Sequence, residues 1–317
     1  MRFNKFDLNL LVALDALLKE RNTTRAAERV CITQSAMSNA LNRLRDYFGD
    51  ELLVRVGQRM ELTPRAESLC EPVREMLLRF DTCIATTPHF DCTQTDRQFK
   101  LFVSDYSTQL LMPHMLALAA RQGSQARFEL CLTNASPSRL LEQGEADLLI
   151  IPQDFCSPEH PTEMVFEDDF VCVAWNGSVH ARNGMDLSAY AEAKHIVMTP
   201  HASTRPSLES AMMERYGFTR EVAVSTHNFS SMPALVIGTP FVATVPSRLA
   251  RLLEPSLPIV VLPLPVPPSM PKPRFKQAMQ WHKYRTTDPG NAWLRDLMRQ
   301  AGAAMEGPFP NGTPGSI

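Results

Sequence analysis

Residues 23–49 read TTRAAERVCITQSAMSNALNRLRDYFG, and this stretch decides the fold of the N-terminal part of the chain. Before it, residues 8–18 repeat apolar side chains at helical spacing, which predicts a first helix. The Asn-Thr-Thr sequence at 22–24 interrupts that pattern and offers N-cap oxygens for a short helix over 25–29. Residues 30–32 then form a short apolar turn. The order helix, short helix, tight turn is typical of a helix-turn-helix.

The next helix, expected over residues 34–48 between Thr33 as N-cap and Gly49 at its end, has two different faces. Its apolar face consists of Ala36, Met37, Leu41 and Leu44. Its other face carries amide, hydroxyl and cationic groups: Gln34, Ser35, Ser38, Asn39, Asn42, Arg43 and Arg45. No carboxylate occurs before Asp46, so this face suits base edges and phosphates rather than a solubilising mixture of Glu and Lys. A merely solvent-exposed polar helix is the alternative, and the preceding short helix and turn favour DNA binding.

A hairpin is expected directly after this helix. Residues 52–62 read as two short strands around a glycine turn, which would carry Arg55 and Arg59 as a wing. Residues 1–63 are therefore predicted to form an all-α winged helix-turn-helix domain. Residues 1–65 hold 11 Lys/Arg and 8 Asp/Glu, a net charge of +3, whereas the whole chain has −2. This distribution is compatible with DNA binding, but a solvated surface without a partner would look the same.

A long linker helix is expected over residues 64–88, because Thr and Pro at 63–64 suit a helix start. Pro72 within it predicts a kink or the loss of one hydrogen bond. Apolar side chains then recur with heptad spacing at Leu69, Val73, Met76, Phe80 and Cys83. Such a seam predicts pairing with the same helix of a second copy, with packing on the chain's own body as the alternative. Residues 89–96 read as a polar hinge.

From residue 97 the pattern changes to short apolar strands that alternate with helices, which predicts an α/β domain with mostly parallel sheets. The expected strands are 99–104, 128–133, 147–152, 170–175, 195–200, 221–226, 241–246 and 259–264. Two such blocks indicate two lobes: lobe I over 97–167 and 271–301, and lobe II over 168–270. Residues 262–273, LPLPVPPSMPKP, read as an extended crossover, or alternatively as a ligand for a polyproline-binding domain. Residues 302–317 are expected to be a disordered tail.

Composition excludes several other classes of protein. The chain of 317 residues has no apolar run as long as a membrane span and no signal-peptide pattern, so no membrane partner and a cytoplasmic location are expected. Its seven cysteines include no C-x-x-C pair, and its eight histidines show no metal-ligand spacing. We find no G-x-S-x-G, H-E-x-x-H or G-x-G-x-x-G motif, so we expect no enzyme, metal or cofactor. A solute-binding or enzymatic two-lobed protein without a DNA role remains the alternative.

The residues just described resemble a known family. Residues 6–67 are similar to the DNA-binding region of LysR-type transcriptional regulators, with Ser35 where many members have proline. The opening residues and Ser-Asp-Tyr at 104–106 are most similar to nodulation-type regulators that answer flavonoids. Residues 281–298, WHKYRTTDPGNAWLRDLM, resemble members that respond to salicylate and other aromatic compounds.

The resemblance implies a dimeric or tetrameric activator of a catabolic or symbiosis-type operon, which would contact RNA polymerase. Its C-terminal domain would be a two-lobed effector domain resembling periplasmic binding proteins. Carried over by position, the residues that would face the major groove of operator DNA are Gln34, Ser35, Ser38 and Asn39. Arg43 would meet a phosphate, and Arg55 in the wing would reach the minor groove.

An effector is expected between the lobes, off the carboxyl ends of the strands and near helix N-termini. The candidate residues are Ser104, Asp105, Tyr106, Asp169, Ser203, Thr204, Arg205, Phe229, Gln280 and His282. Tyr106 and Phe229 favour an aromatic ring, whereas the carboxylates of Asp105 and Asp169 disfavour a strongly anionic ligand. A small aromatic or phenolic co-inducer is therefore predicted. The alternative is that these side chains only cap helices and bond the hinge.

Overall fold

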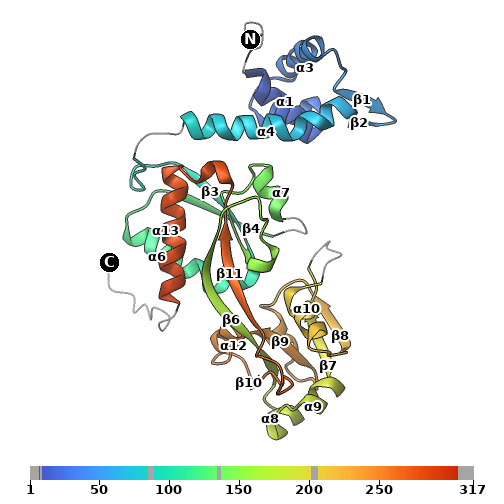
Figure 1. The fold of residues 1–317 in the computed structure, drawn as a ribbon, viewed down its shortest axis with the longest axis vertical. Coiled ribbons are helices and arrows are strands. Elements are labelled where there is room, and N and C mark those ends of the chain that lie inside the picture. Colours follow the sequence, from blue (N-terminus) through green and yellow to red (C-terminus); the bar gives the residue numbers. More distant parts are fainter. Residues whose placement is uncertain (1–6, 8, 85–88, 134–136, 201–205, 306–317) are drawn as a thin grey trace. The chain divides into compact units, whose positions relative to one another are not determined.

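The computed structural model divides the chain into two compact units (Figure 1). It describes residue 7 and residues 9–84, 89–133, 137–200 and 206–305, and the side chains of residues 81–84 lie outside this description. The N-terminal unit runs to Thr87, with the short segment Glu142–Gly144 assigned to it, and the C-terminal unit contains the rest. No helix among the described residues has the length and apolar character that a membrane span requires.

The N-terminal unit is a helical bundle that carries a β-hairpin. Its elements are α1 (Asn9–Glu20), α2 (Thr23–Arg29), α3 (Gln34–Phe48), β1 (Leu53–Val56), β2 (Arg59–Leu62) and α4 (Pro64–Ile84). The hydrophobic core joins α1 to α3, with Leu14, Met37 and Leu44 fully buried. The winged helix-turn-helix expected from the sequence is confirmed, although Ala36 is exposed and Ala40, one turn further on, is buried in its place.

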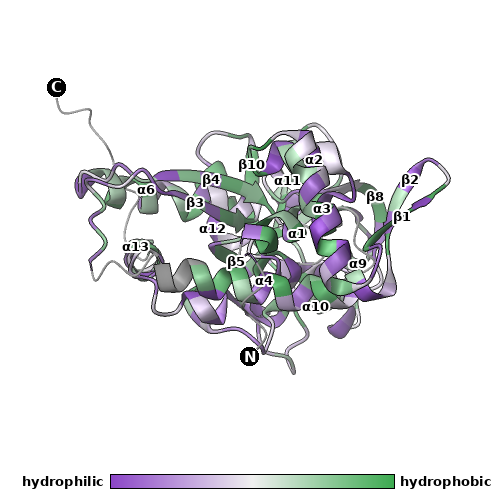
Figure 2. Cartoon of the chain, turned by 90° about the horizontal axis from the view of Figure 1, so that it is seen from above, coloured by the Kyte–Doolittle hydropathy of each residue, from purple (hydrophilic) through white to green (hydrophobic). Residues whose placement is uncertain are grey.

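Helix α4 contains the apolar seam expected for pairing, but the seam divides into two parts. Leu69 and Val73 pack into the core of their own unit. Met76 and Phe80 are 43% and 40% exposed, and the side chain of Cys83 lies outside the described residues. Figure 2 shows hydrophobic and hydrophilic segments alternating along this helix, which continues through Pro72. The first half of the seam, Leu69 and Val73, therefore packs inside its own unit. The second half, Met76 and Phe80, leaves apolar side chains exposed at the surface.

The C-terminal unit is built on one nine-stranded sheet. Its strands are β3 (Gln98–Val103), β4 (Arg127–Leu132), β5 (Leu148–Pro152), β6 (Thr162–Trp175), β7 (Lys194–Met198), β8 (Glu221–Thr226), β9 (Val242–Pro246), β10 (Ile259–Pro263) and β11 (Arg274–Gln280). The helices are α5 (Asp105–Leu110), α6 (Met112–Arg121), α7 (Pro137–Glu142), α8 (Val179–Asn183), α9 (Leu187–Glu192), α10 (Leu208–Arg215), α11 (Met232–Leu235), α12 (Ser247–Leu253) and α13 (Pro289–Ala304), with short 3-10 turns at Gln153–Phe155 and Lys283–Arg285. The eight expected strands are therefore confirmed, and β11 is a ninth strand that the sequence analysis did not list.

The sheet is mixed rather than mostly parallel. In lobe I, β3 lies parallel to β4 and β5, and in lobe II, β7 lies parallel to β8 and β9. The strands that connect the lobes, β6 and β11, pair antiparallel with each other and with their neighbours. Strand β6 is 14 residues long and joins both lobes (Figure 1). Its first half was not predicted, because acidic residues between 162 and 169 interrupt the apolar pattern.

The proline-rich stretch connects β10 to β11 without regular structure over residues 264–273, as the crossover interpretation predicts. At the end of the chain, α13 continues to Ala304, so the first residues of the expected tail belong to a helix, and Gly302 is buried. Residues 306–317 lie outside the described part of the chain.

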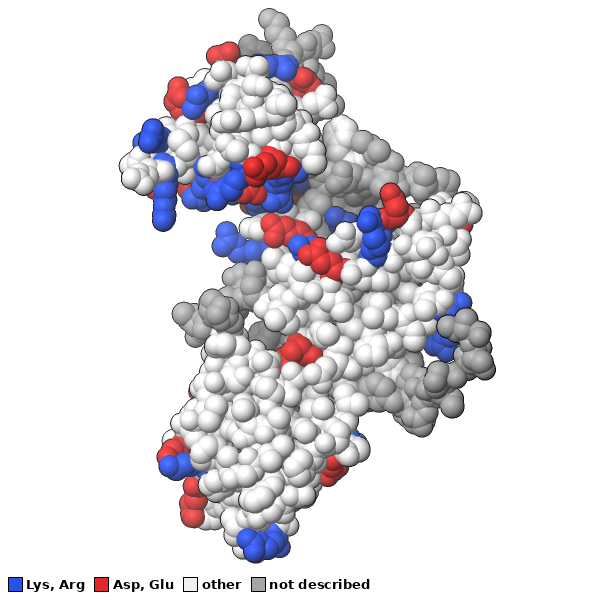
Figure 3. Space-filling model, turned by 180° about the vertical axis from the view of Figure 1, so that it is seen from behind, with Lys and Arg blue, Asp and Glu red and all other residues white. Residues whose placement is uncertain are grey.

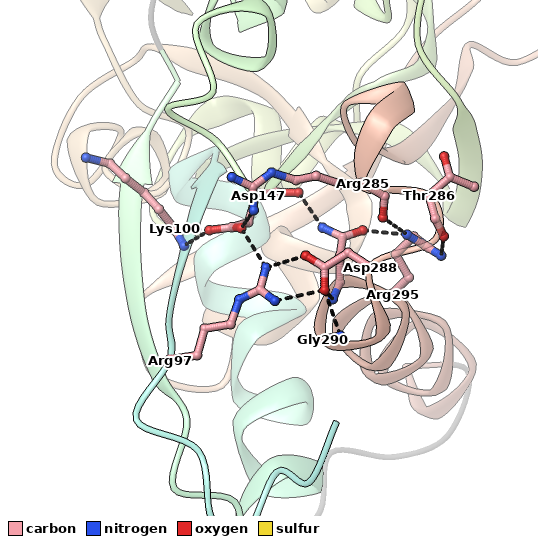
Figure 4. Close-up of polar contacts among 9 residues, drawn as sticks. Arg97, Lys100, Asp147, Arg285, Thr286, Asp288, Gly290 and Arg295 are labelled. Atoms are coloured by element: carbon pink, nitrogen blue, oxygen red, sulfur yellow. Dashed lines mark hydrogen bonds and ion pairs between the residues drawn. The ribbon is translucent and has the colours of Figure 1, made fainter. Parts of the chain in front are cut away.

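A network of ion pairs attaches the start of β3 to the N-terminus of α13 (Figure 4). Arg97 donates through both Nη atoms to the two carboxylate oxygens of Asp288, at 2.8 and 2.6 Å. The buried Asp147 accepts from Arg285 at 2.5 Å and lies 3.4 Å from Arg97. Removing one member would leave a largely buried charge without its partner, so this network fixes α13 on lobe I.

Candidate DNA-binding surface and effector site

Helix α3 begins and ends where its sequence requires. The Thr33 hydroxyl accepts from the backbone N–H of Ala36 at 3.2 Å, which satisfies one of the unpaired groups of the first turn. Gly49 adopts the left-handed conformation with φ of 62°, and its N–H donates to the Arg45 carbonyl at 2.8 Å. These caps fix the helix ends, and the helical period together with the buried Met37, Leu41 and Leu44 determines which side chains share its exposed face.

The predicted base-contacting residues do share one face of α3. Gln34, Ser35 and Asn39 are exposed and Ser38 is half-buried. Arg43 is exposed as well, one turn beyond Asn39, and its Nη2 lies 3.2 Å from the Asp7 carboxylate. The exposed face of α3 therefore carries amide, hydroxyl and guanidinium groups together, as the sequence pattern predicts.

Arg45 has a different role from the one its position in the polar set indicates. Its Nε donates to the Glu51 carbonyl at 2.9 Å, and its Nη2 donates to the Leu53 carbonyl at 3.0 Å. Arg45 therefore ties the end of α3 to the start of the wing and is not free to contact a ligand. The sequence pattern did not distinguish Arg45 from Arg43, because both are arginines outside the apolar face of the same helix.

The wing is a two-stranded antiparallel hairpin, in which Arg55 lies opposite Met60. Its turn contains Gly57 with φ of 62°, and the exposed Arg55 donates from Nε to the Gly57 carbonyl at 3.2 Å. In the face shown by Figure 3, Lys and Arg side chains of the N-terminal unit lie among Asp and Glu side chains, and large parts of the C-terminal unit are uncharged. Cationic groups of the wing thus accompany those of α3 within one compact unit.

In the C-terminal unit, the first predicted effector residues stand at the N-terminus of α5, after the carboxyl end of β3. The Ser104 hydroxyl accepts from the N–H of Ser107 at 3.1 Å and so caps this helix. The Asp105 carboxylate accepts from the N–H of Ser230 at 2.7 Å. Ser230 follows β8 and the half-buried Phe229 in lobe II, so this hydrogen bond joins the lobes. We call the region around it the interlobe site.

Tyr106 points away from solvent and is bonded to a carboxylate that the sequence analysis missed. It is 3% exposed, and its hydroxyl donates to Asp168 at 2.5 Å. Asp168 also accepts from the Ser247 hydroxyl at 2.6 Å and from the Arg248 N–H at 3.3 Å. Burial raises the pKa of both Tyr106 and Asp168. These contacts join α5 of lobe I, β6 and the start of α12.

Asp169, the predicted neighbour, does not contribute to that cluster with its side chain. It lines a separate pocket of about 270 Å³ beside Phe170, Arg251 and Lys272, at the crossover between the lobes. Successive residues of a strand face opposite sides of the sheet, which explains why Asp168 and Asp169 have different surroundings. Of the two adjacent carboxylates, Asp168 is the one that bonds to Tyr106, and the predicted Asp169 lines the separate pocket.

Gln280 and His282, two further predicted effector residues, lie away from the interlobe site. Gln280 is fully buried; its amide accepts from the N–H of Ser157 at 3.0 Å and donates to the Thr162 hydroxyl at 2.7 Å. His282 is 2% exposed and its ring lies 4.7 Å from that of His160. Burial lowers the pKa of His282 to about 4. Because β11 runs antiparallel to β5, its last residues lie at the amino end of β5, away from the interlobe site.

Ser203, Thr204 and Arg205 lie outside the described residues. Within the described part, sequence reasoning also missed Ser107 and Gln277, which are both buried beside the N-terminus of α5. The Gln277 amide donates to the Ser107 hydroxyl at 2.9 Å. No motif signals this pair, because the two residues are 170 positions apart. The described residues contain no group of three or more His, Cys, Asp or Glu side chains arranged to hold a metal ion.

The fold and these sites define a class of protein. A winged helix-turn-helix with a carboxylate-poor recognition face is joined in one chain to a two-lobed α/β domain with polar groups where the lobes meet. This is the organisation of a DNA-binding regulator that responds to a small molecule.

Comparison with known proteins identifies the family. Residues 8–67 match the bacterial regulatory helix-turn-helix proteins of the lysR family, and residues 93–303 match the LysR substrate binding domain. Nodulation protein D from a Bradyrhizobium strain is 37% identical over 305 residues, covering 96% of this chain and 89% of the relative. Nodulation protein D from Rhizobium leguminosarum bv. trifolii is 36% identical over 306 residues, covering 96% and 95%. The chain therefore belongs to the LysR family of transcriptional regulators.

A solved structure supports the fold. A full-length OxyR variant from Pseudomonas aeruginosa superposes with a TM-score of 0.71 at 18% identity, covering 94% of this chain and 95% of the other. At this identity the likeness concerns the fold alone. The family assignment makes the chain an effector-responsive, DNA-binding transcriptional regulator and not an enzyme.

Proposed function

We propose that this regulator reads operator DNA with α3 and the β1–β2 wing, and that a small aromatic or phenolic compound bound at the interlobe site controls transcription. The observation that carries the DNA-binding half is the exposed face of α3. It combines amides, hydroxyls and a guanidinium group and has no carboxylate before Asp46. Such groups complement base edges and phosphates, whereas a helix face that only serves solubility normally mixes Glu with Lys.

Individual roles follow from the chemistry of each side chain. Gln34 and Asn39 can each bond an adenine in bidentate fashion, and Ser35 and Ser38 can donate to or accept from base edges. Arg43 suits a phosphate because it lies further along the helix and is held only by a partly exposed ion pair to Asp7. The separate role of Arg55 is in the wing, where a guanidinium group would enter a narrow minor groove.

The proposal includes a second copy of the chain. Exposed Met76 and Phe80 on α4 favour pairing of two linker helices, and a dimer places two recognition helices on the two half-sites of one operator. We propose a dimer that assembles further into a tetramer, acts as an activator and contacts RNA polymerase. Since its target would be operator DNA, it would act in the bacterial cytoplasm.

The effector half rests on the groups at the interlobe site. Ser104, Asp105 and Ser230 supply polar contacts, and Phe229 and Tyr106 supply aromatic surface close by. Residues 203–205 would add donors from lobe II. Two nodulation proteins D match over nearly the whole chain, and the resemblance to nodulation-type regulators favours a phenolic effector.

A thermal-shift screen with the full chain tests the effector class. We expect stabilisation by phenols and hydroxyflavones, because a ligand that binds only the folded protein raises its Tm. Amino acids and sugars serve as controls. Stabilisation by those controls, with no response to any aromatic compound, would refute the proposed effector class while leaving the DNA-binding role intact.

A further inference from the structure

The side-chain amide of Gln277 is buried, and its oxygen has no hydrogen-bond partner among the described residues although its nitrogen is bonded. The residue is 1% exposed, and its Nε2 donates to the Ser107 hydroxyl at 2.9 Å. Its Oε1 is buried and accepts no hydrogen bond from the described residues. A buried acceptor left in this way destabilises a folded protein, and most such groups in native structures have a partner.

Strand register places this amide at the level of the interlobe site. Val103, the last residue of β3, lies opposite Ile150 of β5, and two residues further on, Pro152 lies opposite Gln277 of β11. At that level β3 has ended and the chain has turned into α5. Gln277 therefore lies at the level of the carboxyl ends of the parallel strands, the end of the sheet at which α/β proteins bind ligands.

The surroundings of the amide are aromatic. Phe166 of β6 pairs directly with Gln277, and Phe275 precedes it by two residues, so both rings lie on the same face of the sheet. Tyr106 has its ring centroid 6.1 Å from that of Phe166 and 6.0 Å from that of Phe275. Asp168 already accepts from the Tyr106 hydroxyl, whereas Oε1 of Gln277 accepts from no described residue. An unmet acceptor beside three rings suits a ligand with an aromatic body and one hydrogen-bond donor.

We infer that Gln277 selects the effector by accepting a hydrogen bond from its hydroxyl group, so that the protein distinguishes a phenol from the matching methyl ether. This inference rests on the proposed interlobe effector site. A methyl ether retains the ring but has no proton to donate, so it would bury the Oε1 acceptor without satisfying it. Ser104 would extend the polar edge, because its hydroxyl donates to that of Ser107 at 3.1 Å.

Gln280 provides a matched control on the same strand. It is as deeply buried as Gln277, but both ends of its amide are bonded, to Ser157 and Thr162. Replacing Gln280 by Leu removes satisfied bonds and should lower the Tm of the full chain. Replacing Gln277 by Leu removes one bond, to Ser107, together with an unsatisfied acceptor, so it should lower the Tm less than Gln280→Leu does.

The experiment measures binding of two probe pairs to the full-length protein by calorimetry: para-hydroxybenzoate against para-methoxybenzoate, and a monohydroxyflavone against its methyl ether. We expect the wild-type protein to prefer the hydroxyl form of at least one pair by about tenfold, the effect of one hydrogen bond. Gln277→Leu should reduce that ratio to about one, by the same reasoning. Gln280→Leu and the conservative variant Gln277→Glu should retain the preference.

Three results would overturn the inference. If Gln277→Leu binds phenols with the wild-type preference, Gln277 does not read the hydroxyl, although the interlobe effector site survives. If Gln277→Leu lowers the Tm as much as Gln280→Leu does, its amide is a structural bond rather than an unmet acceptor. If neither pair binds the wild-type protein, the proposed effector class fails and this inference fails with it.

Discussion

Asn39 and Arg43 lie one turn apart on the exposed face of α3, yet they should affect DNA binding differently. Asn39→Ala should change sequence preference at one base pair by roughly 1–3 kcal/mol, because a bidentate amide contact reads the base edge. Arg43→Ala should weaken binding to all sequences alike and lower the salt slope by about one, because it removes a phosphate contact. Binding to a set of single-base operator variants at several salt concentrations measures both effects. Uniform loss of affinity in Asn39→Ala would contradict the assignment of a base contact.

If Arg43 contacts a phosphate as proposed, Asp7 competes with DNA for its guanidinium group. The ion pair is 3.2 Å long and both side chains are partly exposed, so a phosphate can replace the carboxylate. Asp7→Asn should therefore strengthen DNA binding by about two- to threefold at low salt, with a smaller effect at high salt. The double variant Asp7→Asn with Arg43→Ala should show no gain over Arg43→Ala alone. Weaker binding by Asp7→Asn would show that Asp7 positions Arg43 rather than competing for it.

Buried histidines make the C-terminal unit sensitive to mild acid. Burial lowers the pKa of both His195 and His282 from 6.5 to about 4. Between pH 6.5 and 4 the unfolded chain therefore binds more protons than the folded one, and stability falls as the pH is lowered through this range. His282→Asn retains a side-chain acceptor for the Tyr284 N–H and does not titrate. The difference in Tm between pH 7 and pH 5 should be smaller in this variant, and an unchanged difference would contradict the account.

At the scale of elements, α4 combines two packing roles on one seam. Leu69 and Val73 stabilise the N-terminal unit, while Met76 and Phe80 remain exposed for a partner. Phe80→Glu should halve the molecular mass of the assembly, because an unpaired charge is costly to bury in a helix pair. Glu71→Gln, exposed on the same helix but off the seam, serves as control. Light scattering measures the mass, and a wild-type mass for Phe80→Glu would exclude this seam as the interface.

Elements with strong local signals could be predicted from the sequence. Helix α3 has the predicted bounds because Thr33 and Gly49 cap it chemically, and the eight expected strands occur because each is an apolar run between breakers. The first half of β6 was missed, because its acidic residues serve the lobe connection rather than a core. The heptad seam was read as one interface, although tertiary packing assigns half of it to the chain's own unit.

For the molecule as a whole, the sites differ in how far the sequence determines them. The DNA-binding face follows the period of one helix, so its members could be identified from one segment. The interlobe site draws on β3, β8 and β11, and contacts such as Asp105 with Ser230 or Ser107 with Gln277 depend on the topology. Gln280 lies at the amino end of β5 and Gln277 at its carboxyl end, and spacing along the chain does not reveal which end of a strand reaches the site.

The most direct test of the account uses the full-length protein and the DNA upstream of its own gene, at a fixed salt concentration. Fluorescence anisotropy should show tighter binding to this DNA than to a scrambled duplex, with a phenolic compound changing the affinity or the footprint. The variant Gln34→Ala with Asn39→Ala should lose the preference for the specific duplex. Equal binding to both duplexes by the wild-type protein, with no effect of any aromatic compound, would contradict the claim of an effector-controlled operator reader.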